Sequence, residues 1–363
     1  MASIDKRPNG KWRARWREYP TGPQKTKHFT RKVDAERHLV SVQHDLATGR
    51  YVDPTKARTT VGDYYRLWSA RQPWRSSSRA SIDSSFRTHV LPAFGVRPLS
   101  TLRRGDIEAW AARLPVAPRT AGLALQYLGT MLEAAVADGI LAVNPARRAK
   151  RPRVEVRPVM PLTQDELDAL CDAAPPWFRV AITLGAAAGL RQGEAAGLSV
   201  DRVDFLGRSL TVDRQLVTPA RGDPVFGPPK TARSFRTVPL ADIAVEDLAR
   251  SVERVATGAD GLVLHENGRP VSRRRFSEVW GVLRRRAALD SVKYHALRHT
   301  YASTLLSGGV SIAAAADYLG DSPAMLLRTY AHLMPADHDR ARVVVQTAFA
   351  RAAEDSLRTA PDS

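Results

Sequence analysis

The segment YHALRHTYAS, residues 294–303, has a residue spacing that indicates a helix with two potential anion-binding side chains on one face. Apolar residues recur in it at helical intervals, and two glycines at 308 and 309 end the pattern, so we predict a helix over 295–306. His295 and Arg298 stand three residues apart. Residues with this spacing share one helix face, so both side chains could reach the same anion.

The segment LGDSPAMLLRTYAHLMP, residues 319–335, follows that helix. Gly320 ends one predicted helix, and Ser322 with Pro323 begins a short one that contains Tyr330. A tyrosine hydroxyl has a free pKa of about 10, so it must lose its proton before it can act as a nucleophile. We expect His295 to be the base nearest to Tyr330.

The segment AAGLRQGEAAGL, residues 187–198, places an arginine just after a buried helix. The predicted helix over 178–188 ends at Gly189, so Arg191 lies in the turn that follows. We expect Glu194 to brace Arg191 or the next helix. Upstream, Thr163 and Glu166 have the spacing of a capping box that opens a further helix.

The segment PPKTARSFRTVPL, residues 228–240, carries Lys230 in a turn. We predict that strands over 209–217 and 235–240 pair on either side of this turn. A lysine on such a mobile hairpin can reach into a bound substrate and donate a proton.

These segments together offer what phosphodiester cleavage requires: a nucleophile, cations for the non-bridging oxygens and an acid for the leaving oxygen. Arginine suits the cation role because its planar guanidinium stays charged and matches two phosphate oxygens. Any one of these residues is more often structural, so the inference depends on the whole set. The candidate catalytic residues are Arg191, Lys230, His295, Arg298 and Tyr330.

In order and spacing these five residues resemble the tyrosine recombinase, or phage integrase, family. The resemblance implies a site-specific recombinase that cuts and rejoins DNA through a 3′-phosphotyrosyl bond and a free 5′-hydroxyl, with no cofactor, metal or ATP. It also implies a homotetramer on double-stranded DNA with core-type and arm-type attachment sites, integration and excision through a Holliday junction, and, as further partners, a DNA-bending host factor and a directionality factor.

One position departs from the family pattern. Where the family has His or Trp after the glycine of its LGH motif, this chain has Asp321. An ionised carboxylate accepts hydrogen bonds and repels phosphate, so it cannot replace a donor. We expect Asp321 to act locally, favouring the positive end of the helix that contains Tyr330.

The first 157 residues hold almost all of the excess positive charge. The whole chain has a formal net charge of +18, of which +8 lies in residues 1–60 and +9 in residues 61–157. Such a concentration is typical of polyanion binding. In KWRARWREY, residues 11–19, apolar and basic residues alternate, which predicts a strand. Its basic face is the predicted DNA contact: Lys11, Arg13, Arg15 and Arg17.

The pattern of elements predicts a multidomain α+β chain. A small sheet with strands over 11–19 and 25–30 and a helix over 34–46 is followed by helices over 61–68, 79–91, 104–114 and 119–138. A basic stretch, ARRAKRPRVEVRP (residues 146–158), follows these helices, and three of its residues are predicted to contact the DNA backbone: Arg148, Lys150 and Arg151. The resemblance implies that residues 1–57 form an arm-type DNA-binding domain of a small sheet and a helix, and that residues 58–150 form a helical core-binding domain. Residues 151–160 are a linker, and residues 161–350 form a mainly α catalytic domain with a small sheet. Residues 351–363 are a tail that we expect to be disordered.

Composition excludes several classes. The single cysteine, Cys171, cannot form an internal disulfide or a thiolate zinc site. No apolar run has the length of a membrane span, and the first residues have no secretory pattern, so we expect no membrane partner and a cytoplasmic location. The family resemblance implies that this is the cytoplasm or nucleoid of a bacterial host.

Four alternatives remain at this stage. HALRH, residues 295–299, lacks the glutamate of a zinc protease motif, and we interpret His299 as packing. A type IB topoisomerase would have no need of an arm-type domain. A metal-dependent nuclease or transposase would need carboxylates such as Asp201, Asp204 and Asp213, whose spacing is not that of metal ligands. An inactive architectural DNA-binding protein is the alternative from another functional class.

Overall fold

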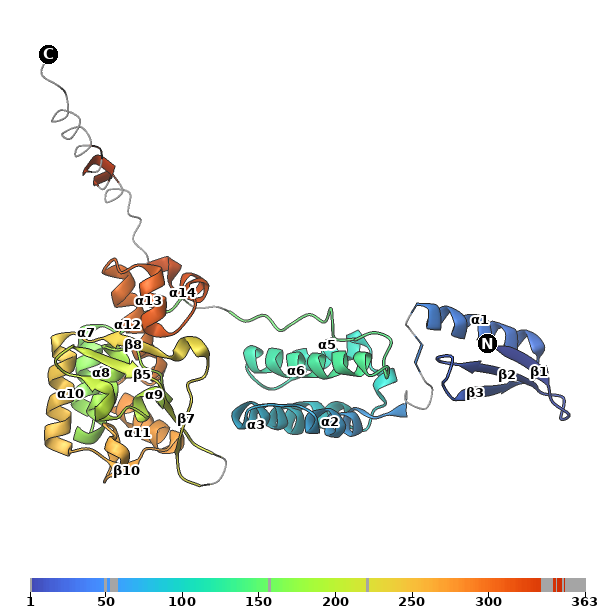
Figure 1. The fold of residues 1–363 in the computed structure, drawn as a ribbon, viewed down its shortest axis with the longest axis horizontal. Coiled ribbons are helices and arrows are strands. Elements are labelled where there is room, and N and C mark those ends of the chain that lie inside the picture. Colours follow the sequence, from blue (N-terminus) through green and yellow to red (C-terminus); the bar gives the residue numbers. More distant parts are fainter. Residues whose placement is uncertain are drawn as a thin grey trace, which may run out of the picture. The chain divides into compact units, whose positions relative to one another are not determined.

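The computed structural model describes residues 2–48, 51–52, 58–155, 158–219, 222–333, 342–343, 345–347 and 349 (Figure 1). The chain divides into two compact units, residues 1–156 and 157–363. Both combine helices with small sheets, and helices predominate, which confirms the predicted fold class. The predicted tail over 351–363 lies outside the described residues.

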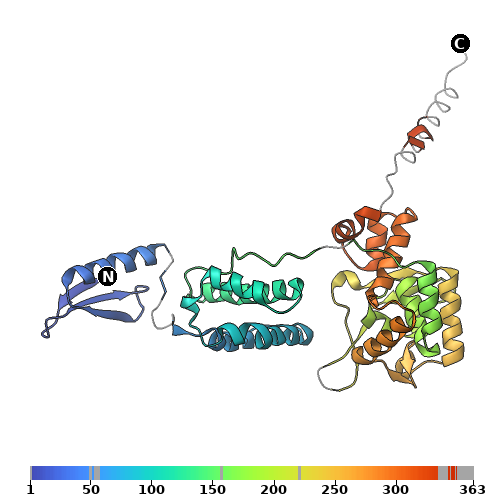
Figure 2. The ribbon, with the colours of Figure 1, turned by 180° about the vertical axis from the view of Figure 1, so that it is seen from behind.

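The first unit begins with a three-stranded antiparallel sheet covered by one helix, and both views show the helix lying along the sheet (Figures 1 and 2). The two predicted strands and the predicted helix are present. A third strand was not predicted, because SIDK is too short and too polar to show a period. The elements are β1 (Ser3–Lys6), β2 (Trp12–Arg17), β3 (Gln24–Phe29) and α1 (Lys32–Ala47).

The apolar face of β2 forms the core of this sheet and helix. Ala14 and Trp16 are buried against Leu39 of α1, as the alternation predicts. The indole N–H of Trp16 donates to the hydroxyl of Tyr51 (2.9 Å). The basic face of β2 therefore points away from this core.

The rest of the first unit is helical and has a separate aromatic core. Tyr65 stacks on Phe86 with ring centroids 3.9 Å apart, and Trp68 packs edge-on against Trp74. The predicted helix over 79–91 contains a π-helical turn at Phe86–Val90. The elements are α2 (Val61–Ala70), α3 (Ser76–Ser85), η2 (Phe86–Val90), α4 (Leu91–Phe94), η3 (Leu99–Thr101), α5 (Arg104–Arg113) and α6 (Pro118–Ala137).

The second unit packs helices around the buried helix α8, with small sheets at one side (Figure 1). The capping box predicted at Thr163 and Glu166 is present at the start of α7. The helices are α7 (Gln164–Ala173), α8 (Pro176–Ala186), α9 (Gln192–Ala196), α10 (Asp242–Val255), α11 (Arg273–Arg286), α12 (His295–Ser307), α13 (Ile312–Leu319) and α14 (Pro323–Tyr330), with short turns η4 (Val200–Arg202), η5 (Ala232–Ser234), η6 (Ala259–Gly261) and η7 (Ala331–Leu333).

The predicted strand over 209–217 is two strands, which corrects the sequence interpretation. It breaks at residues 213 and 214, where Asp213 binds Arg202. The first half pairs with the predicted partner, whereas the second half pairs with a strand that precedes Lys230. The strands are β4 (Val203–Asp204), β5 (Ser209–Val212) and β8 (Arg236–Pro239) in one sheet, β6 (Gln215–Val217) with β7 (Val225–Gly227), and β9 (His265–Glu266) with β10 (Arg269–Pro270).

Two left-handed glycines end the helices that surround the candidate site. Gly189 follows α8 with φ +63°, and Gly320 follows α13 with φ +62°. A Cβ on Gly320 would lie 2.9 Å from the carbonyl oxygen of Arg233, so the tight approach requires glycine. The backbone N–H of Gly320 donates to the carbonyl oxygen of Asp317, and that of Asp321 donates to the carbonyl oxygen of Ala316, both at 3.0 Å. These bonds fix the turn between α13 and α14.

Candidate active site

Arg298 lies on α12 and is 2% exposed. Its Nη1 donates to the carbonyl of Gly189 (2.6 Å), and its Nη2 donates to the carbonyl of Leu319. Both carbonyls lie at the ends of helices, where they have no partner within the helix. Burial lowers the pKa of Arg298 to about 10, so the group remains charged at neutral pH.

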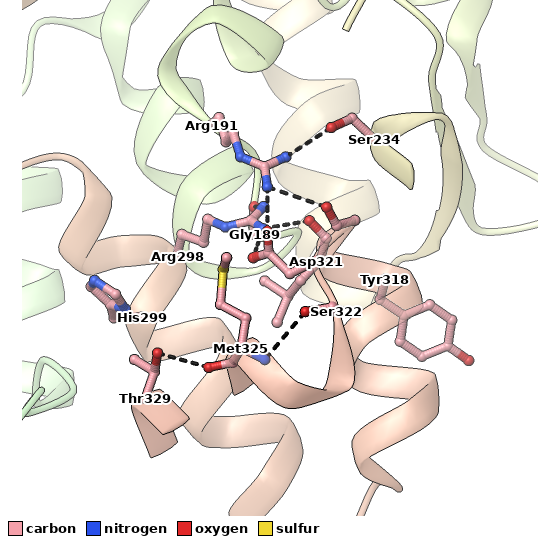
Figure 3. A network of polar contacts seen from close by, with 12 residues as sticks. Gly189, Arg191, Ser234, Arg298, His299, Tyr318, Asp321, Ser322, Met325 and Thr329 are labelled. Atoms are coloured by element: carbon pink, nitrogen blue, oxygen red, sulfur yellow. Dashed lines mark hydrogen bonds and ion pairs between the residues drawn. The ribbon is translucent and has the colours of Figure 1, made fainter. Parts of the chain in front are cut away.

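The side chain of Arg191 extends from the start of α9 and places its guanidinium beside that of Arg298 (Figure 3). Its Nη1 donates to Glu194 Oε1 (2.9 Å) and to Ser234 Oγ (3.4 Å). Its Nη2 donates to the carbonyl of Gly320 (3.3 Å) and to Asp321 Oδ1 (2.6 Å). The guanidinium is therefore held from several sides while its side chain remains 27% exposed.

Asp321 joins the two arginines. Oδ1 accepts from Arg191 and Oδ2 accepts from Nη2 of Arg298, each at 2.6 Å. Figure 3 shows both guanidinium groups directed at this carboxylate. The expectation of a merely local role at the start of α14 is wrong, because the arginines bind both oxygens. Ser322 caps that helix by accepting from the N–H of Met325 (3.3 Å).

Glu194 is the second anion of the site and is buried, with 3% exposure. Its Oε2 accepts from Arg236 Nη2 (2.8 Å) and from the backbone N–H of Arg191 (3.0 Å). Burial alone would raise its pKa, but the hydrogen bond and charge of Arg236, together with Arg191, lower it to about 2. Glu194 thus braces Arg191, as predicted, and is ionised at every working pH.

Tyr330 ends α14 and is 5% exposed. Its hydroxyl lies 2.5 Å from Nδ1 of His299. Burial raises the pKa of Tyr330 to about 12, and Asp321 adds to this effect while Arg298 opposes it. The hydroxyl is therefore protonated at neutral pH and needs a base to become a nucleophile.

His299, and not His295, is the imidazole on that hydroxyl. This corrects two expectations, that His295 is the nearest base and that His299 only packs. Burial lowers the pKa of His299, with Arg298 adding to the effect, so its ring is neutral at neutral pH. In the tautomer with its proton on Nε2, Nδ1 accepts the phenolic O–H. The spacing in HALRH places both histidines on one helix face, and this pattern was the feature of the sequence that could have identified His299.

His295 lies beside His299 on α12, with ring centroids 4.6 Å apart and planes at 77°. Its side chain is exposed. Although the residue as a whole is exposed, its ring packs against His299 and loses part of its hydration, which, together with the nearby charges of Arg298 and Arg191, lowers the pKa of His295 to about 4. A neutral ring beside two guanidiniums can accept or relay a proton but adds no positive charge.

Lys230 is exposed and lies between β7 and η5. Ser234, at the end of η5, contacts Arg191, so the segment that carries Lys230 is tied to the arginine pair. This attachment places the lysine on a segment that adjoins the site.

The predicted DNA-binding residues of the first unit differ in exposure, and Arg13 and Arg15 are half-buried. Asp5 of β1 binds Arg13 (2.8 Å) and Arg15 (3.2 Å), which removes part of the positive charge of the β2 face. Arg17 donates to the carbonyl of Gly22 (2.7 Å). Exposed side chains belong to Lys11, Arg17, Arg148, Lys150 and Arg151.

The carboxylates considered for a metal site serve other contacts. Asp201 and Asp213 bind Arg202 at 2.5 and 2.7 Å, and Asp204 accepts from the N–H of Gly207 (2.7 Å). Within the part of the chain that the structure describes, no group of three or more His, Cys, Asp or Glu side chains could hold a metal ion. No helix among the described residues is long and apolar enough to cross a membrane.

Comparisons with known proteins agree with this geometry. The model of the phage integrase family matches residues 161–336. A putative prophage phiRv2 integrase of Mycobacterium tuberculosis is 24% identical over 337 residues, which is 88% of each chain.

Two solved structures share the fold. The integrase of transposon Tn1549, in complex with transposon right end DNA, is 21% identical with a TM-score of 0.69, over 79% of this chain and 99% of that one. A lambda integrase tetramer bound to a Holliday junction is 19% identical with a TM-score of 0.54, over 88% of this chain and 95% of that one.

We predict that Glu194→Gln lowers the free energy of unfolding by about 3 kcal/mol, because it leaves the buried Arg236 without its counter-ion. Since the folded-state pKa is about 2 and the ordinary value is 4.5, the stabilisation is complete above pH 4.5 and is lost as the pH falls towards 2. Urea unfolding from pH 7 to pH 3 measures the difference between the two proteins, which should shrink at low pH.

The matched control is Glu278→Gln, which removes an exposed partner of Arg274 and should cost under about 1 kcal/mol. Equal losses in the two variants would contradict the role of Glu194.

Proposed function

The chain belongs to the tyrosine recombinase (phage integrase) family and is a site-specific DNA recombinase, and we propose that it uses Tyr330 to cut and rejoin DNA through a 3′-phosphotyrosyl intermediate. The observation that carries this proposal is the pairing of Arg191 and Arg298 on one carboxylate beside the buried Tyr330. Two guanidiniums that bind the two oxygens of a carboxylate can bind two non-bridging oxygens of a phosphate in the same way.

In the proposed first step, Oη of Tyr330 attacks the scissile phosphorus. The bond from phosphorus to the 5′-oxygen breaks, which leaves a 3′-phosphotyrosine and a free 5′-hydroxyl. His299 takes the phenolic proton at Nδ1, where its contact with the hydroxyl supports this role. Lys230 gives a proton to the leaving 5′-oxygen, and its exposed position on the segment tied to Arg191 suits that transfer.

The two arginines stabilise the charge that develops on the phosphate. Arg298 is fixed by carbonyls at two helix ends, and Arg191 is fixed by Glu194 and Ser234. Donors held in place before the reaction need no reorganisation during it. His295, neutral and exposed beside His299, relays protons between the site and solvent.

Rejoining reverses the chemistry. The 5′-hydroxyl of a second strand gives its proton to Lys230 and attacks the phosphotyrosine. The bond from phosphorus to Oη of Tyr330 breaks, and His299 returns the phenolic proton. The phosphotyrosine bond conserves the energy of the broken phosphodiester, so neither ATP nor a metal ion is needed. This exchange results in integration or excision of a mobile element.

We assign the first unit to DNA binding. Residues 1–57 would bind arm-type sites, and residues 58–150 would bind core-type sites. The linker 151–160 would contact the DNA backbone, and residues 161–350 would form the catalytic domain. The concentrated positive charge and the exposed basic residues support this division. The contacts would be made by Lys11, Arg13, Arg15, Arg17, Arg148, Lys150 and Arg151.

We further propose that four copies assemble on two duplexes in the cytoplasm or nucleoid of a bacterial host, with a DNA-bending host factor and a directionality factor. The lambda integrase structure, a tetramer on a Holliday junction, supports the assembly by its similar fold.

We predict that Tyr330→Phe abolishes the covalent adduct with DNA while leaving DNA binding unchanged, because the variant loses only the hydroxyl. A nicked duplex that bears the core site would trap the adduct, and a denaturing gel would display it in the presence of a chelator. An adduct that persists in the variant would exclude Tyr330 as nucleophile. An adduct absent even from the native chain would favour an inactive architectural protein.

We predict that His299→Ala slows adduct formation about 100-fold at pH 7, because the buried hydroxyl loses its base. The defect should narrow as the pH rises towards the pKa of Tyr330, about 12, since hydroxide then ionises the tyrosine. Single-turnover rates from pH 7 to pH 10 measure this trend. His332→Ala removes an exposed histidine that contacts the carbonyl of Val159 and serves as the control. A His299→Ala rate equal to that of the control would contradict the assignment.

A further inference from the structure

We propose that Asp321 is a built-in substitute for the scissile phosphate, which occupies the arginine pair in the DNA-free protein and must leave it before cleavage. This inference rests on the proposed function, because it assigns the same two arginines to the phosphate. It gives Asp321 a gating role that neither its position in the sequence nor the family comparison indicates.

The geometry of the arginine pair is that of an occupied anion site. Asp321 offers one oxygen to each guanidinium at the same distance, 2.6 Å. The N–H groups that bind these oxygens point to a single position (Figure 3). A phosphate at that position would need the same donors, and an ionised carboxylate beside it would repel it. Carboxylate and phosphate therefore compete.

The arginines are held by contacts that do not involve Asp321. Arg298 donates to the carbonyls of Gly189 and Leu319, and Arg191 donates to Glu194, Ser234 and the carbonyl of Gly320. These contacts can persist when the carboxylate leaves. An incoming anion therefore meets a site that is already arranged.

The carboxylate can leave without any change in the fold. The backbone at residues 320 and 321 is fixed by the hydrogen bonds that end α13, and Ser322 caps α14 independently. The Asp321 side chain is 22% exposed, so rotation about its side-chain bonds would take it into solvent. Only the side chain has to move.

Removal of the carboxylate should turn the arginine pair into an open phosphate site. Arg298 would then be a buried cation without its acidic partner, and such a charge binds an available anion strongly. Asp321→Asn keeps the shape of the side chain and removes its charge, so it separates competition from packing.

The test is thermal unfolding of the full-length protein in inorganic phosphate, with chloride at equal ionic strength as the reference. Phosphate should raise the Tm of Asp321→Asn by about 3 °C more than that of the native chain, as expected for a ligand near ten times its dissociation constant. Asp317→Asn is the matched control. It removes the same charge from the exposed surface of α13, the helix that precedes Asp321, and should behave like the native chain.

Equal phosphate-induced Tm shifts in Asp321→Asn and the native chain would overturn the proposal. A Tm shift in Asp317→Asn as large as that in Asp321→Asn would also overturn it, because net charge alone would then explain the effect. If Asp321→Asn does not fold, Asp321→Ser provides the same comparison with a smaller polar side chain. The readout needs no catalysis. A phosphate shift in a protein that forms no DNA adduct would support competition between Asp321 and an anion at the arginine pair but reject the proposed function. An adduct without the shift would support the proposed function and reject the competition.

Discussion

The second unit depends on the burial of one charged group, the guanidinium of Arg298. A cation with 2% exposure is costly unless every direction around it offers an acceptor. The chain meets this requirement with the carbonyls that end α8 and α13 and with the carboxylate of Asp321. The helix ends gain donors that they otherwise lack, and the arginine gains a fixed orientation. Stability and site geometry therefore have the same origin.

The other groups of the proposed mechanism are positioned by this arrangement. Arg191 enters beside Arg298 because Gly189 turns the chain directly after α8, and Glu194 holds it there. Tyr330 enters from α14, which begins directly after the turn at Gly320, and His299 meets it one residue beyond Arg298. The proposed nucleophile, base and phosphate clamp come from distant segments and assemble only in the folded unit, where burial shifts their pKa values.

The sequence missed β1 and the break between β5 and β6, but it was sufficient for many of the helices, because periodicity and capping act locally. The glycine stops at residues 189 and 320 and the capping box at Thr163 are of this kind. Contacts between elements depend on tertiary packing, which local sequence patterns do not encode. HALRH places His295 and His299 on one face, but only the packing of α14 against α12 decides which ring meets Tyr330. Asp321 likewise appeared to be a helix-end residue, because no local pattern shows that two arginines converge on it.

The most direct test is a structure of the protein bound to an uncleaved core site. We predict that two non-bridging oxygens of the scissile phosphate lie within hydrogen-bond distance of Arg191 and Arg298, that Asp321 has turned away, and that the Tyr330 hydroxyl lies between the phosphorus and His299. A phosphate bound elsewhere, with Asp321 still joining both arginines, would contradict this prediction.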